Sequence, residues 1–196
     1  MKKFGCLALI ILAVILGVWG FSSYNSLVGM DEGVKAAWSQ VENVYQRRAD
    51  LIPNLVKTVE GASNFERETL TQVIEARSKA TAIQLTPEAL ADPQALSRFQ
   101  QAQDALGSAL SRLLAVSEAY PELKANQNYL QLQDELAGTE NRIAVERKRF
   151  NEAAQTFNTA RRRFPTVLIA GLLGFKEKAY FQASPGADRP PEVKFQ

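Results

Sequence analysis

Histidine is absent from the 196-residue sequence, and cysteine occurs once, at Cys6. Without histidine the chain lacks the usual imidazole ligand of zinc and haem sites and the base of a serine–histidine catalytic triad. A single cysteine also excludes a disulfide within one chain. We therefore expect no catalytic, metal-binding or cofactor-binding residues.

A strong excess of charge of one sign is also missing, because 23 basic residues oppose 21 acidic ones and the net charge is +2. The basic residues are spread along the chain, whereas nucleic-acid-binding proteins concentrate them on one surface. Nucleic acid is therefore not an expected partner. A chain of this length predicts one domain with a hydrophobic core, here joined to an anchor.

The anchor is the uncharged run from Phe4 to Phe21, "FGCLALIILAVILGVWGF". Its roughly 18 residues reach the lower length limit of a membrane-spanning helix. Lys2 and Lys3 precede it, and the positive-inside rule then keeps this short end in the cytoplasm. Residues 1–23 are thus predicted to be a single-pass anchor in the bacterial inner membrane, with the rest of the chain on the outer, periplasmic side.

A cleaved signal peptide is the alternative for this run, because signal peptides share the basic start and the apolar core. Val18 and Gly20 would serve as a small-residue cleavage site. We favour the anchor, since the run is longer than the usual core of about 7–15 residues in a signal peptide.

Beyond the anchor the apolar residues recur with helical spacing, and no alternating strand pattern persists. The first soluble segment places one stripe on a helix at Val34, Trp38, Val41, Tyr45, Arg48, Ile52, Leu55 and Val59. Pro53 lies within that stripe and is expected to bend the helix or break its hydrogen bonding near residue 49. Further helices are predicted over residues 65–84 and 95–119.

A fourth helix, from Pro121 to Arg163, has the most regular spacing. Its heptad seam, as in a coiled coil, consists of Tyr129, Leu132, Leu136, Thr139, Ile143, Glu146, Phe150, Ala153, Phe157, Ala160 and Phe164. At 1.5 Å per residue this helix would span roughly 60 Å. The sequence therefore predicts an all-α protein: an N-terminal transmembrane helix, then an elongated antiparallel four-helix bundle over residues 24–164, and a short C-terminal apolar helix.

Two charged residues, Arg48 and Glu146, occupy core positions of the first and fourth helices. Counted from the membrane, their heights roughly agree, so they are candidates for a structural ion pair that fixes the register of the two helices. The alternative is that each lies at the edge of its seam and reaches water along its own stem.

A second apolar stretch, residues 165–183, follows the fourth helix and is too short to cross a bilayer. We expect it to meet lipid or a neighbouring subunit through Phe164, Leu168, Leu172, Phe175, Lys176, Lys178, Tyr180 and Phe181. The alternative is a short helix folded back onto its own bundle. Because the anchor holds all copies in one plane, we also predict a homo-oligomer. The proline-rich residues 184–196 should be extended or disordered.

Four stretches resemble the LemA family: "YNSLV" after the anchor, "AWSQVENVYQRRADLIPNLVKTV", "NYLQLQDELAGTENRIAVERKRFNEA" and "FPTVLIAGLLGFKEKAYFQA". The resemblance covers nearly the whole chain. It implies a membrane-anchored protein with a helical bundle, and it implies no reaction or cofactor. Val167 and Leu173 depart from the residues often found in the family, Asn and Phe, without threatening the resemblance.

These features favour a non-catalytic membrane scaffold that self-associates or holds partner proteins at the bacterial cell envelope. One alternative is a regulator or sensor module for an envelope protease or signalling system. An enzyme is the other, with catalytic carboxylates at Glu135, Glu140 or Glu146 beside Arg142 and Arg147. Such residues on helix faces are usually solvated salt bridges.

Overall fold

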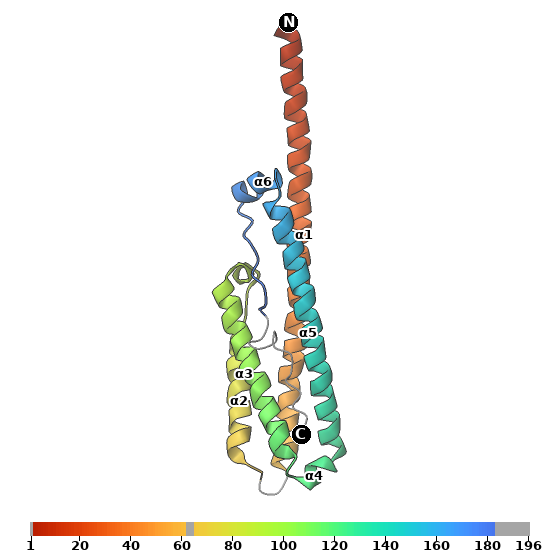
Figure 1. The fold of residues 1–196 in the computed structure, drawn as a ribbon, viewed down its shortest axis with the longest axis vertical. Helices are drawn as coiled ribbons and strands as arrows, with labels where there is room; N and C mark the ends of the chain where they lie inside the picture. The colour runs from red at the N-terminus through yellow and green to blue at the C-terminus, as the bar shows by residue number, and fades with distance from the viewer. Residues whose placement is uncertain (1, 62–64, 183–196) are drawn as a thin grey trace, which may run out of the picture.

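The structure, a computed structural model, describes residues 2–61 and 65–182, with side chains from Ile10 onward. Throughout these residues the regular structure is helical (Figure 1), which confirms the all-α prediction. The elements are α1 (Lys2–Glu60), α2 (Arg67–Ala82), the 3-10 helix η1 (Pro87–Ala91), α3 (Pro93–Ser117), α4 (Pro121–Lys124), α5 (Gln127–Arg162) and α6 (Thr166–Leu172).

Helix α1 is 59 residues long and joins the anchor to the bundle without a break. Its N-terminal part projects alone beyond the other elements (Figure 1). Within the described residues, α1 is the one helix that is long and apolar enough to cross a membrane. The same helix then supplies the predicted stripe, and all eight of its positions from Val34 to Val59 are buried.

The bundle pairs α1 with the antiparallel α5, and the hairpin of α2 and α3 packs on the half of this pair that lies away from the anchor (Figure 1). One core lies toward the anchor and includes Trp38, Phe99 and Phe150. A second core lies toward α4 and includes Ile52, Leu106 and other aliphatic residues. The predicted elongated four-helix bundle is therefore confirmed.

The prediction of one unbroken fourth helix is wrong at its start, because α4 ends at Lys124 and α5 begins at Gln127. Asn126 separates the two helices. Its side-chain Oδ1 accepts hydrogen bonds from the backbone amides of Asn128 and Tyr129, at 3.0 and 3.3 Å. An asparagine that caps the following helix in this way competes with continuation of the preceding one.

Pro53 leaves α1 helical but removes one hydrogen bond, as the sequence predicted. Proline has no N–H to donate to the carbonyl of Ala49, four residues earlier. Arg77 of α2 supplies the missing donor, with its Nε 2.7 Å from the Ala49 oxygen. Because Ala49 is buried, this contact satisfies a backbone acceptor that water does not reach.

Candidate functional site

The three candidate catalytic carboxylates do not converge on one site. Each is paired with a different arginine: Arg47–Glu135 at 3.7 Å, Arg48–Glu140 at 2.9 Å and Arg149–Glu146 at 2.8 Å. Glu135 and Glu140 line separate cavities, and Glu146 lines neither of them. Within the described residues, no three histidine, cysteine, aspartate or glutamate side chains are placed to hold a metal ion.

Arg48 is buried, but its partners differ from the predicted one. Its Nη2 donates to the backbone oxygen and the side-chain Oε1 of Gln103, at 3.0 and 2.7 Å, while Nη1 donates to Glu140. Glu146 instead accepts from Arg149 on its own helix. Glu140 lies six residues before Glu146, which is about 9 Å along α5 at 1.5 Å per residue. Counting residues from the membrane is too coarse to distinguish two positions this close on one helix.

The residues after α6 return along the bundle as an extended segment, residues 175–182, which we call the C-terminal segment (Figure 1). Side-chain amides from α5 and α3 each form a pair of hydrogen bonds with the backbone of one of its residues. The pairs are Asn158 with Lys178 at 2.9 and 2.8 Å, Asn151 with Phe181 at 3.0 and 2.9 Å, and Gln100 with Gln182 at 3.0 and 3.2 Å. We call these three side chains the amide clamp.

The spacing of the two clamp asparagines along α5 matches the spacing of the backbone groups that they bind in the C-terminal segment. Asn151 and Asn158 are seven residues apart, which is about 10.5 Å along a helix. Lys178 and Phe181 are three residues apart, or about 10 Å along an extended chain. Since the segment runs antiparallel to α5, one amide meets each of these backbone units. The backbone amide of Ala179 also donates to the Leu90 oxygen, at 2.9 Å, on the other side.

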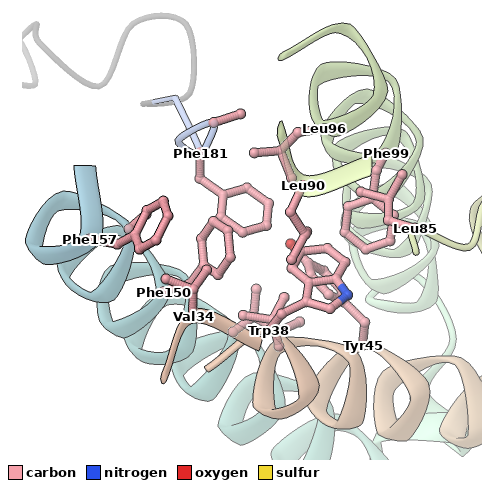
Figure 2. Packing of buried hydrophobic residues seen from close by; sticks show 14 of the residues in the cluster. Val34, Trp38, Tyr45, Leu85, Leu90, Leu96, Phe99, Phe150, Phe157 and Phe181 are labelled. Atoms are coloured by element: carbon pink, nitrogen blue, oxygen red, sulfur yellow. The ribbon is translucent and has the colours of Figure 1, made fainter. Parts of the chain in front are cut away.

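Phe181 and Ala179 of the C-terminal segment belong to the bundle core, and Lys178 is buried beside them. The Phe181 ring stacks on Trp38 with the centroids 6.0 Å apart and meets Phe150 edge-on at 5.5 Å (Figure 2). Lys178 is 8% exposed and places its Nζ 2.7 Å from Asp31 Oδ1 and 5.4 Å from the Phe157 ring centroid. The segment therefore completes the core near the anchor.

The ion pair changes the titration of Asp31. Burial of the carboxyl raises its pKa, but hydrogen bonds from Lys178 and Lys35 lower it by more, so the pKa falls below its usual 3.8. The folded protein thus favours the charged form of Asp31, which in turn holds Lys178 in place.

Helix α6 presents an apolar surface that no other described element covers. Phe164, Leu168 and Leu172 are 82%, 64% and 85% exposed, and Val167 and Leu173 are also exposed. We call these five residues the apolar patch. On the opposite side Ala170 is buried, and Ile169 Cδ1 lies 3.8 Å from the position that a Cβ on Gly20 of α1 would occupy.

The sequence profile of the LemA family matches residues 37–195. The chain belongs to the LemA family. One relative is the magnetosome protein MamQ of Magnetospirillum gryphiswaldense, 32% identical over 183 residues that cover 85% of this chain and 67% of the relative. Another is the protein LemA of Metamycoplasma hominis, 29% identical over 160 residues that cover 82% of this chain and 69% of the relative.

In this LemA-family protein, the predicted interface residues separate into two groups. Lys178 and Phe181 are buried, so the expectation that they face lipid or a subunit is wrong. Phe175 is half-buried against Tyr24 and Phe157, with ring centroids 6.1 and 6.2 Å apart. Hence this part of the segment folds back onto the bundle, as in the alternative, but as an extended chain rather than as a short helix.

The remaining candidates are at the surface: Phe164, Leu168, Leu172, Lys176 and Tyr180 are all exposed. The predicted extended tail, residues 184–196, lies outside the described residues. The sequence did not predict the three residues of the amide clamp. Their only signal was a pair of asparagines one heptad apart on α5, with Asn158 next to the seam residue Phe157.

Proposed function

We propose that this protein is a non-catalytic, membrane-anchored scaffold of the bacterial cell envelope that self-associates or holds partner proteins there. The observation that carries the proposal is the continuity of α1. Ile10 and Val18 are exposed apolar residues of its anchor part, whereas Val34 and Trp38 of the same helix are buried in the bundle core. A bundle built on its own anchor is held at a fixed place relative to the lipid.

The dispersed carboxylates support a non-catalytic role, because every candidate is engaged by its own arginine. The name of one relative, a magnetosome protein, refers to a cellular structure rather than to a reaction. Anchoring also favours self-association, because copies that are oriented and confined to a plane meet at a high effective concentration. The anchors and bundle flanks then supply the contacts.

The location is tested with protease added to spheroplasts that produce the full chain. We expect digestion of the bundle, since Lys2 and Lys3 hold the short end in the cytoplasm. A cytoplasmic protein serves as the control for intact spheroplasts. Complete protection of the bundle would place it in the cytoplasm and refute the proposed topology.

Assembly is tested by purification in mild detergent followed by light scattering and particle imaging. A discrete homo-oligomer, or a complex with another protein at fixed stoichiometry, is the expected result. A monomer that carries no partner across several mild detergents would contradict the scaffold proposal.

A further inference from the structure

We propose that the apolar patch on α6 is a second membrane contact, which docks into the outer leaflet of the bilayer that α1 crosses. This inference rests on the proposed anchoring of α1. It assigns lipid, rather than water or another protein, as the occupant of the patch. The seven residues of α6 are far too few to span a bilayer, so a contact at the bilayer surface is the membrane role that its length allows.

The height of α6 along the anchor carries the proposal. Ile169 packs beside Gly20, one residue before the apolar run of the anchor ends at Phe21 and the polar residues Ser22 and Ser23 follow. The first charged residue beyond that run is Asp31, about 15 Å further along the helix at 1.5 Å per residue. Helix α6 therefore lies beside the end of the apolar run, where α1 leaves the hydrocarbon.

Helices α1 and α6 both expose apolar side chains at this height. Val18 and Phe21 of α1 are 66% and 70% exposed, which is unfavourable in water and suits lipid. Because α6 packs against α1 here, its patch extends the lipid-facing surface of the anchor sideways. An interfacial helix buries its apolar face about 5–10 Å into the boundary between headgroups and acyl chains, and this depth suits a single short helix.

Basic residues flank the patch along the chain, at the end of α5 and shortly after α6. Arg161 and Arg162 lie 3.7 and 3.8 Å from Glu177, which leaves them partly neutralised. Arg163 and Lys176 are exposed and make no ion pair within the described residues. Cations next to an apolar face suit the phosphates of lipid headgroups, especially anionic ones.

The consequence is a fixed orientation of the bundle. An anchor alone allows α1 to tilt in the bilayer, and the bundle tilts with it because the helix is continuous. A second contact beside the first opposes that tilt. The amide clamp makes the contact effective, because it fastens the chain to α5 and α3 directly after α6. Docking of α6 is thus transmitted to the bundle by an element that is itself part of the core.

The test uses the full chain in liposomes that contain anionic lipid, with Cys6→Ser to remove the only cysteine. Single cysteines at Leu168 and Leu172 carry a spin label, and power saturation compares accessibility to oxygen with accessibility to a water-soluble nickel chelate. Val14, an exposed anchor residue, is the lipid control, and Leu130, an exposed residue of α5, is the aqueous control. Helical content measured by circular dichroism checks that each variant folds.

At Leu168, Leu172 and Val14 we expect the spin label to be more accessible to oxygen than to the nickel chelate. At Leu130 we expect the label to be more accessible to the chelate. Chelate dominance at Leu168 and Leu172 with oxygen dominance at Val14 would overturn the docking of α6 while leaving the anchor intact. Chelate dominance at Val14 as well would refute the anchoring itself. Low access to both reagents, with spin–spin broadening that unlabelled protein dilutes away, would instead assign the patch to a second copy and overturn the proposal.

Discussion

The side-chain amide of Asn158 forms two hydrogen bonds with the backbone of Lys178, through Nδ2 to the oxygen at 2.9 Å and through Oδ1 from the amide at 2.8 Å. Both residues are buried, so water does not replace these bonds. In a sheet a neighbouring strand would satisfy such backbone groups. Here a helix side chain does so, and the C-terminal segment adds Phe181 to the core without a second strand.

Replacing Asn158 with Leu should destabilise the protein by about 2–4 kcal/mol, because two buried backbone groups lose their partners. Hydrogen exchange at the amide of Lys178 should accelerate together with that of its neighbours. Urea denaturation in detergent and exchange mass spectrometry measure the two effects. Thr159→Leu is the matched control, since Thr159 is exposed on the same helix. Unchanged exchange in the Asn158 variant would show that the clamp does not hold the segment.

The partner of Arg48 is tested by two double-mutant cycles. Arg48→Met with Glu140→Gln should show a coupling energy of about 0.5–3 kcal/mol, as expected of residues in contact. The cycle of Arg48→Met with Glu146→Gln should be additive to within about 0.5 kcal/mol. Arg48→Met alone should cost several kcal/mol, of order 2–4, because Gln103 also loses its donor. Coupling to Glu146 rather than Glu140 would contradict the observed geometry.

The contact between Arg77 and Ala49 should depend on Pro53. Arg77→Leu leaves the Ala49 oxygen without a donor and should cost about 1–3 kcal/mol. In a Pro53→Ala background the new N–H can satisfy the same oxygen, so the cost of Arg77→Leu should fall by about half or more. Chemical denaturation of the four proteins gives the comparison. Equal costs in both backgrounds would mean that Arg77 acts only through packing.

The helical stripe of α1 could be predicted from the sequence alone. Helical spacing fixes which side chains share a face, and each residue from Val34 to Val59 in the stripe is buried, Arg48 included. The missing hydrogen bond near residue 49 was equally predictable, because it follows from the covalent structure of Pro53. Both features follow from residues that lie close together in the sequence.

The partners of these residues could not be predicted. Arg48 and Glu140 are 92 positions apart, and six residues along α5 separate the true partner from the expected one. Burial of Phe181 depends on the clamp, in which Gln100 and Gln182 are 82 positions apart. The stretch "KEKAYF" has no periodicity of its own, so its path is set by side chains elsewhere in the chain.

The ion pair between Asp31 and Lys178 ties the C-terminal segment to α1. The pKa of Asp31 is lower in the folded protein than its usual 3.8, so the charged carboxylate contributes stability above that value. This contribution is lost as the pH falls through the folded pKa. Asp31→Asn should therefore destabilise the protein at about pH 7, and the difference from the wild type should shrink toward about pH 3.

The free energies of unfolding of the wild type and the variant are compared at each pH. Other carboxylates titrate over the same range in both proteins, so their effects on stability cancel in the difference. Lys35, which also contacts Asp31 at 3.0 Å, remains charged throughout and does not produce a step of its own. Urea denaturation across the pH series gives the free energies, and hydrogen exchange at Ala179 reports the segment directly. A difference between wild type and Asp31→Asn that stays constant down to about pH 3 would mean that the charge of Asp31 does not hold Lys178.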